Sequence, residues 1–177
     1  MNVNKISVDQ IGHSEIFSKL YDEYLPKLYK YTLYKVGDTN VAEDLVSEVF
    51  EKMLEKYHTY NREKGAFSTW LFTIANNMII NYHKKNGRKL YLFDFDKVES
   101  KYRLEDQIID RELKELLLKG IMCLDERQRS IIALKFGACL TNRQIARMMN
   151  LTESNIGTIL YRALGQLKDI LKEQGFY

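Results

Sequence analysis

Apolar residues recur three and four positions apart along most of this 177-residue chain, and only one proline, Pro26, interrupts them. This spacing is typical of one face of an α-helix, and no long stretch alternates between polar and apolar residues as a strand would. Proline removes a backbone donor and clashes with the preceding turn, so a chain with a single proline leaves its helices largely uninterrupted. The pattern therefore predicts an all-α protein.

The periodic segments form two groups with a break between them. The break covers about residues 87–103, where charged residues mix with the segment LYLFDF and no period holds. We therefore expect two small helical domains, 14–86 and 104–173, joined by a linker. The helices expected in the first domain cover 14–36, with a kink or restart at Pro26, then 39–57 and 67–85.

Helix start and stop signals divide the second domain. Asp125 and Thr141 are each followed three residues later by a glutamine, which is the spacing of a capping box at a helix start. Thr152 precedes a last long periodic stretch that reaches toward 172, and Gly137 is expected to end a helix. Together with a first helix over about 104–123, these signals predict four helices.

The composition disfavours several classes of protein. Hydrophobic residues make up 45% and charged residues 29% of the chain, as in folded globular proteins. No apolar run approaches the ~20 residues of a membrane helix, and the N-terminus lacks a signal-peptide layout, so a cytoplasmic protein without membrane insertion is expected. Cys123 and Cys139 lie within helical patterns and are expected to be buried thiols.

Residue patterns that support catalysis or metal binding are also missing from the sequence. The histidines at positions 13, 58 and 83 do not have the spacing of metal ligands. There is no nucleophile elbow, no carboxylate pair in a glycine-framed loop and no phosphate-binding glycine loop. We therefore expect a protein that is not an enzyme and needs no metal or cofactor.

The segment 141–168, TNRQIARMMNLTESNIGTILYRALGQLK, has the pattern of a helix-turn-helix. The small side chain of Ala146 lets two helices approach closely, and Asn150 tolerates the left-handed conformation of a tight turn. The second helix is of a size to enter the major groove of DNA. The alternative is an ordinary helical hairpin within a bundle.

The candidate reading face of this motif contains few charges. Its only cation is Arg162, so we expect few specific contacts and modest affinity. Phosphate contacts would come from Lys135, Arg143, Arg147 and Lys168. The residues assigned to the reading face are Thr152, Glu153, Asn155, Thr158, Tyr161 and Arg162.

A second candidate nucleic-acid segment, GAFSTWLFTIANNMIINYHKKNGRK, ends the first domain. Aromatic side chains beside a cationic tail suit an unpaired strand, because bases stack on the rings and phosphates meet the charge. The alternative places Trp70 in the core and leaves the lysines at a solvated helix end. The residues assigned to this site are Phe67, Trp70, Asn76, Asn77, Asn81, Lys84 and Lys85.

The helix between these aromatics and the N-terminal helix has an acidic face. Outside its apolar stripe it carries Glu43, Asp44, Glu48, Glu51 and Glu55. Such a face repels DNA. It is either a plain solvated surface or a docking surface for a basic protein partner.

Together these segments resemble the sigma-70 family of RNA polymerase subunits, in its small extracytoplasmic-function (ECF) form. VAEDLVSEVFEKML is similar to the helix that binds the clamp helices of polymerase, and GAFSTWLFTIANNMIINYHKK to the promoter-melting and minus-ten segment. LDERQRSIIALKFGACLTNRQIARMMNLTESNIGTILYRAL is similar to the minus-thirty-five segment. The resemblance covers about residues 17–171, with the linker left out.

The resemblance implies a sigma factor that binds core RNA polymerase, through the β′ clamp helices and the β flap, and directs it to promoter DNA. It also allows an anti-sigma factor as a partner. It places the loop 60–65 in the family's base-capturing role, which adds Tyr60, Arg62 and Lys64 to the single-strand site. Polymerase contacts are implied for Asp44, Leu45, Ser47 and Glu48.

The competing hypothesis is a transcription regulator that binds duplex DNA through its helix-turn-helix without being a polymerase subunit. The acidic helix followed by the Trp70 segment argues against it. Gly157 and Ile159 stand where basic residues are frequent in the family, which implies weak reading of the minus-thirty-five element.

Overall fold

The computed structural model describes residues 8–86 and 111–174, and within them every element is helical, which confirms the all-α prediction. The predicted linker 87–103 and the first residues of the second domain, 104–110, lie outside the described residues. The first domain contains α1 (Val8–Val36), α2 (Thr39–Lys56), a 3₁₀ segment η1 (Tyr57–Thr59) and α3 (Phe67–Asn86). The second contains α4 (Arg111–Cys123), α5 (Glu126–Ile132), a π-helical segment η3 (Ala133–Gly137), α6 (Asn142–Met149) and α7 (Glu153–Glu173).

The helices begin at the predicted capping residues. Asp125 and Thr141 both form complete capping boxes with the glutamine three residues on. The Thr152 side chain accepts a hydrogen bond from the Asn155 backbone N–H at 3.2 Å. Each cap satisfies a backbone donor that the helix leaves free, which is worth about 1 kcal/mol. Local sequence therefore accounts for the starts of α5, α6 and α7.

The N-terminal helix differs from its prediction. α1 begins at Val8 and continues through Pro26 as one helix, so of the expected kink or restart there, the restart does not occur. An interior proline costs a helix roughly 3 kcal/mol. Leu25 and Leu28 flank it and pack in the core, which offsets that cost. Gly37 ends α1 as expected for a helix stop, with a φ of 76°.

The two cysteines were expected to be buried, and this expectation is wrong, because both thiols are exposed. Cys123 is the last residue of α4 and lies where the helix meets solvent. Cys139 follows η3, in the connection to α6, and has a φ of 56°. The helical spacing of apolar residues does not show that a residue at the end of an element is exposed.

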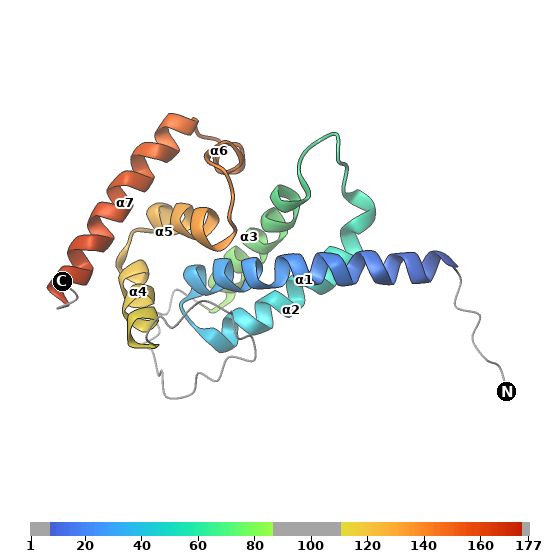
Figure 1. Ribbon diagram of the computed structural model, residues 1–177, viewed down its shortest axis with the longest axis horizontal. Coiled ribbons are helices and arrows are strands. Elements are labelled where there is room, and N and C mark those ends of the chain that lie inside the picture. Colours follow the sequence, from blue (N-terminus) through green and yellow to red (C-terminus); the bar gives the residue numbers. More distant parts are fainter. Residues whose placement is uncertain (1–7, 87–110, 175–177) are drawn as a thin grey trace.

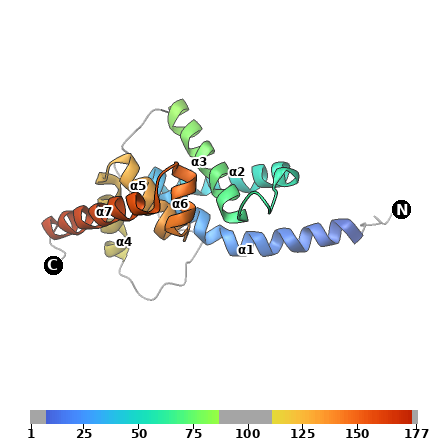
Figure 2. The same cartoon turned by 90° about the horizontal axis from the view of Figure 1, so that it is seen from above.

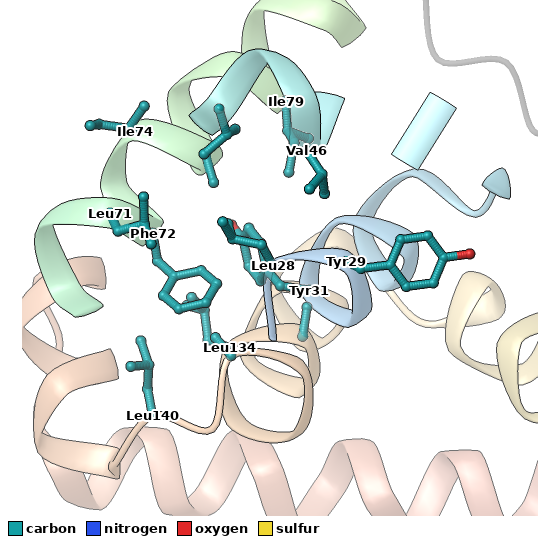
Figure 3. Packing of buried hydrophobic residues seen from close by; sticks show 14 of the residues in the cluster. Leu28, Tyr29, Tyr31, Val46, Leu71, Phe72, Ile74, Ile79, Leu134 and Leu140 are labelled. Carbon is teal, nitrogen blue, oxygen red and sulfur yellow. The ribbon is translucent and has the colours of Figure 1, made fainter. Parts of the chain in front are cut away.

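The elements of the two domains lie against one another. In Figures 1 and 2, α2 lies beside α1, and α5 covers the C-terminal half of α1 while the N-terminal half extends away. A single cluster of buried side chains runs from the first domain into η3, α6 and α7. Figure 3 shows Leu134 and Leu140 of the second domain close to Phe72 of α3 and Leu28 of α1. The two domains therefore share one core in this structure.

A smaller apolar cluster completes the second domain. It joins α4 to α7, mainly through Ile121, Leu124 and Leu167. α7 is thus held along its length, at its start by α6 and toward its end by α4. No helix in the described part of the chain is both long and apolar enough to cross a membrane.

Candidate functional site

The helix-turn-helix has the predicted geometry. α6 ends at Met149, and the next residue, Asn150, caps it with a left-handed φ of 53° and ψ of 50°. The Leu151 N–H donates to the Ala146 carbonyl at 2.9 Å. The buried Ile145 and Ile156 join α6 and α7. The turn thus packs the first turn of α7 against α6 through Ile156, while the opposite side of that turn, with Thr152 and Glu153, stays exposed.

The predicted reading face lies on the outer side of α7. Thr152, at its start, and most of the outer positions of the helix are exposed, and Tyr161 is 81% exposed. Arg162 is exposed beside it, and a Cβ atom added at Gly157 of the same helix would meet no heavy atom within 4 Å. The face is therefore accessible in this conformation. Its exposed members are Thr152, Glu153, Asn155, Thr158, Tyr161 and Arg162.

The candidate phosphate contacts have different surroundings. The Arg143 Nε donates to Glu153 Oε1 at 2.9 Å, across the two helices of the motif. Both side chains are largely exposed, and an exposed ion pair is worth well below 1 kcal/mol in most cases, so a phosphate can displace Glu153. A hollow of about 500 Å³ beside this pair is lined by Arg147 as well. Lys135 is half-buried in η3, outside the helix-turn-helix itself.

Five aromatic rings gather where α3 begins. Phe67 lies at their centre, with its ring centroid 5.3 Å from that of Tyr60 and 5.4 Å from that of Trp70. Tyr24 and Tyr57 complete this aromatic cluster. Neither tyrosine was predicted for the site. A signal existed for Tyr57, because it precedes Tyr60 by three residues, the same spacing that places Phe67 and Trp70 on one side of a helix.

The aromatic cluster is half-buried, packed against the core on one side and open to solvent on the other. Phe67 and Trp70 pack against the core but remain partly exposed. Burial, followed by the charge of Glu23, raises the pKa of Tyr24 to about 12, so its hydroxyl stays neutral at physiological pH. The cluster therefore offers uncharged ring faces beside solvent, as base stacking requires.

The loop between Tyr60 and Gly65 is a tight, internally bonded turn. The Tyr60 hydroxyl donates to the Gly65 carbonyl at 3.3 Å, and the Asn61 side chain accepts from the Glu63 N–H at 2.8 Å. Arg62 and Lys64 are exposed at its tip. The loop thus presents two cations next to the aromatic cluster.

One exposed track runs along α3 from the aromatic cluster to its end. Asn77 and Lys84 follow Trp70 at intervals of seven residues and therefore lie on the same side of the helix, with Asn81 beside them. All three, and Lys85, are exposed. Asn76 is directed differently, because its Oδ1 accepts a hydrogen bond at 3.3 Å from the buried Tyr31 hydroxyl. The track consists of Asn77, Asn81, Lys84 and Lys85.

The aromatic end and the lysine end of this track are well separated. Lys84 follows Phe67 by seventeen positions, which correspond to about 26 Å of helix. No single base contacts both ends. A nucleic-acid strand would have to run along α3 to reach the rings and the lysines together.

The acidic face of α2 is also in place. Asp44, Ser47 and Glu48 are exposed, and the described residues provide no ion-pair partner for either carboxylate. Further along, Lys52 donates a hydrogen bond to Glu55 at 2.6 Å, which lowers the pKa of that carboxyl. Leu45 is only 5% exposed and belongs to the core. Leu45 packs α2 against the core, and the exposed acidic face of the helix consists of Asp44, Ser47 and Glu48.

The burial of Leu45 gives a direct test of its role. Truncating a buried leucine removes apolar contacts and leaves a cavity, at a cost of about 2–5 kcal/mol. We expect Leu45→Ala to lower the free energy of unfolding by that amount, as measured by urea denaturation. An unchanged stability combined with lost partner binding would instead make Leu45 a surface contact.

Comparison with known proteins follows the same division into two regions. Residues 20–89 match the family described as Sigma-70 region 2, and residues 114–167 match Sigma-70, region 4. The chain is 31% identical over 169 residues to the ECF RNA polymerase sigma factor BldN of Streptomyces coelicolor, covering 93% of this chain and 63% of that protein. It is 30% identical to the ECF RNA polymerase sigma factor SigX of Bacillus subtilis, covering 90% of this chain and 87% of that protein.

Two solved structures share the fold. One is the sigma factor RpoE in complex with the anti-sigma factor NepR from Bartonella quintana, with a TM-score of 0.70 and 24% identity, covering 89% of this chain and 98% of that one. The other is CnrH in complex with the cytosolic domain of CnrY, with a TM-score of 0.66 and 15% identity, covering 90% of each chain. The chain therefore belongs to the sigma-70 family, among its ECF members.

Proposed function

We propose that this chain is a sigma factor: it binds core RNA polymerase and directs it to start transcription at particular promoters. The observation that carries the proposal is the order of three surfaces on one chain. An exposed acidic face on α2, an aromatic cluster with a polar track on α3, and a helix-turn-helix follow one another within two matched family regions. An ordinary DNA-binding regulator needs only the last of these.

The acidic face is the proposed polymerase contact. Asp44 and Glu48 lie four residues apart on one side of α2, with Ser47 beside them. The β′ clamp helices are the proposed docking site for this face, and the β flap for the second domain. Such a partner places the chain in the cytoplasm. The proposed role of the chain is to recognise polymerase and promoter DNA, without a catalytic step of its own.

The helix-turn-helix is the proposed reader of the upstream promoter element. The first turns of α7 would enter the major groove, where base edges carry a distinct pattern of donors and acceptors. Arg162 would read a base, while Arg143 and Lys135 would hold phosphates. An anti-sigma factor is a proposed further partner, supported by the complex in which the RpoE relative was solved.

The first domain is the proposed holder of the separated strand at the minus-ten element. The loop with Arg62 and Lys64 would hold one base out of the stack, next to the aromatic cluster. Unstacking a base costs a few kcal/mol, and stacking on an aromatic side chain returns about 1–3 kcal/mol per base. The strand would then follow the polar track of α3 toward Lys84 and Lys85.

Two substitutions distinguish a residue that contacts a base of the upstream element from one that contacts a phosphate. We expect Arg162→Ala to cost about 1–3 kcal/mol at the preferred sequence, because it removes a base contact. Lys135→Ala should weaken binding at all sequences and reduce the salt dependence of binding by about one ion. Footprinting of the holoenzyme at several salt concentrations measures both effects. Intact upstream protection in both variants would contradict the proposed role of the second domain.

Capture by core polymerase tests the proposed function itself. The tagged chain is mixed with purified core enzyme, and the complex is isolated in the absence of DNA. We expect a stoichiometric complex. A chain that binds duplex DNA specifically but does not associate with core polymerase would be a regulator of the ordinary helix-turn-helix kind.

A further inference from the structure

Glu153 places a negative charge at the start of the helix proposed to enter DNA. The segment 141–162 of the helix-turn-helix contains three arginines, and Glu153 is its only acidic residue. The Glu153 side chain is exposed at the first position of α7, where residues of a recognition helix meet base edges. Because every phosphate of DNA is negatively charged, a carboxylate at this position weakens binding unless a donor on the DNA pairs with it.

An arginine of the preceding helix neutralises this charge in the absence of DNA. The Arg143 Nε donates to Oε1 of Glu153 at 2.9 Å, across the turn of the motif. Arg143 and Arg147 lie one helical turn apart on α6, and both line the hollow of about 500 Å³ beside Glu153. Two guanidinium groups in this position suit a phosphate of the DNA backbone. A phosphate that takes Arg143 leaves the Glu153 carboxylate without its partner.

The major groove offers a free carboxylate few hydrogen-bond donors. Guanine presents two acceptors there, and thymine presents an acceptor and a methyl group, so neither base pairs with an anion. Adenine presents an amino group beside the acceptor N7, whereas cytosine presents its N4 amino group with no acceptor of its own at that edge. Cytosine is therefore the base that accommodates Glu153 best.

A carboxylate at a helix start also has a structural role, because it interacts favourably with the helix dipole. The start of α7 is already capped by Thr152, whose Oγ1 accepts a hydrogen bond from the Asn155 N–H at 3.2 Å. A purely structural Glu153 predicts a change in stability on substitution and no change in the bases that are bound. Base preference therefore distinguishes the two roles.

We propose that Glu153 selects a cytosine in the upstream promoter element by accepting a hydrogen bond from its N4 amino group, after a backbone phosphate has taken Arg143. This inference rests on the proposed function and deepens it. The selection comes mainly from rejection, because at a base without an amino group the carboxylate stays unpaired among the phosphates. A reading face with few cations gains specificity in this way.

Exchange of the carboxylate for an amide tests the proposal, because glutamine has the shape of glutamate but pairs with adenine. Holoenzymes made with the parent chain, Glu153→Gln and Glu153→Ala bind a library of promoter fragments randomised in the upstream element, and the bound fragments are sequenced. We expect the parent to enrich cytosine at one position by about tenfold, the size of one base contact. Glu153→Gln should enrich adenine at that position, since its amide donates to N7 and accepts from N6. Glu153→Ala should enrich neither base.

Removal of the amino group from the DNA gives an independent readout. The selected cytosine is replaced by 2-pyrimidinone, which lacks the N4 amino group. We expect the parent holoenzyme to lose about tenfold in affinity for this template, and the Glu153→Ala holoenzyme to lose none. The alanine variant should also bind unrelated duplexes more tightly than the parent, because it lacks the charge that the phosphates repel.

The matched control is Asp169→Ala, which removes the same charge from an exposed position near the end of α7. It should keep the parent's preference for cytosine. Base preferences that are the same in the parent, Glu153→Gln and Glu153→Ala would overturn the inference, as would enrichment of adenine in place of cytosine by the parent. A chain that forms no holoenzyme with core polymerase would instead count against the sigma-factor function, and the same selection with the chain alone would then decide the role of Glu153.

Discussion

Replacing Asp44 and Glu48 by lysine together is expected to abolish binding to core polymerase. The two carboxylates lie on one exposed stripe of α2, and reversing both changes the charge of that face by four units. Like charges brought together across an interface cost several kcal/mol, and the complex should be lost from co-purification. Because both side chains are exposed, the melting temperature should stay close to that of the parent chain.

The matched control for this variant carries the same charge change elsewhere. Glu15 and Asp22 are exposed on α1, so Glu15→Lys with Asp22→Lys alters the net charge equally without touching α2. We expect this control to co-purify with polymerase normally. Loss of binding in both variants would point to a general charge effect, and retention in both would exclude the α2 face as the docking site.

Truncation of the aromatic cluster is expected to damage promoter melting far more than polymerase binding. Trp70→Ala or Phe67→Ala should reduce open-complex formation by about tenfold for each ~1.4 kcal/mol of lost stacking. Trp70 is the cleaner position, because Phe67 touches four other rings and its loss also loosens the cluster. Permanganate reactivity of unpaired thymines measures the effect directly.

A pair of substitutions distinguishes stacking from packing at Trp70. Trp70→Phe keeps an aromatic face and Trp70→Leu keeps only apolar bulk, so we expect the first to melt promoters better than the second. A template with a pre-opened minus-ten bubble should restore much of the lost activity. If Trp70→Leu instead lowered the melting temperature and the bubble template restored nothing, Trp70 would be a core residue, and the melting role would pass to Phe67 and Tyr60.

Features that depend on a few neighbouring residues could be predicted from the sequence. The capping boxes at Asp125 and Thr141 and the left-handed Asn150 each satisfy backbone groups within one turn, so their residues are close in the sequence. The helix-turn-helix follows from these signals together with apolar spacing. The exposed acidic stripe of α2 could likewise be predicted, because the helical period places its carboxylates on the side opposite the apolar residues.

Features that depend on contacts between distant segments could not be predicted. The position of Gly137 reads as a helix stop, but its role is to let η3 approach Tyr31, more than 100 residues earlier. Asn76 resembles its neighbour Asn77 in the sequence, and only the packing of α1 against α3 turns it toward the Tyr31 hydroxyl. The shared core of the two domains is the largest such feature, because helical periodicity shows which face is apolar but not which helix covers it.

Transcription reconstituted from purified components tests the central claim most directly. The chain is added to core polymerase with a library of promoter fragments, and the transcripts are sequenced from their starts. We expect initiation that depends on the chain and falls at fragments sharing two sequence elements at a fixed separation. Initiation by core polymerase that is unchanged by the chain, at every fragment and salt concentration, would contradict the assignment of this protein as a sigma factor.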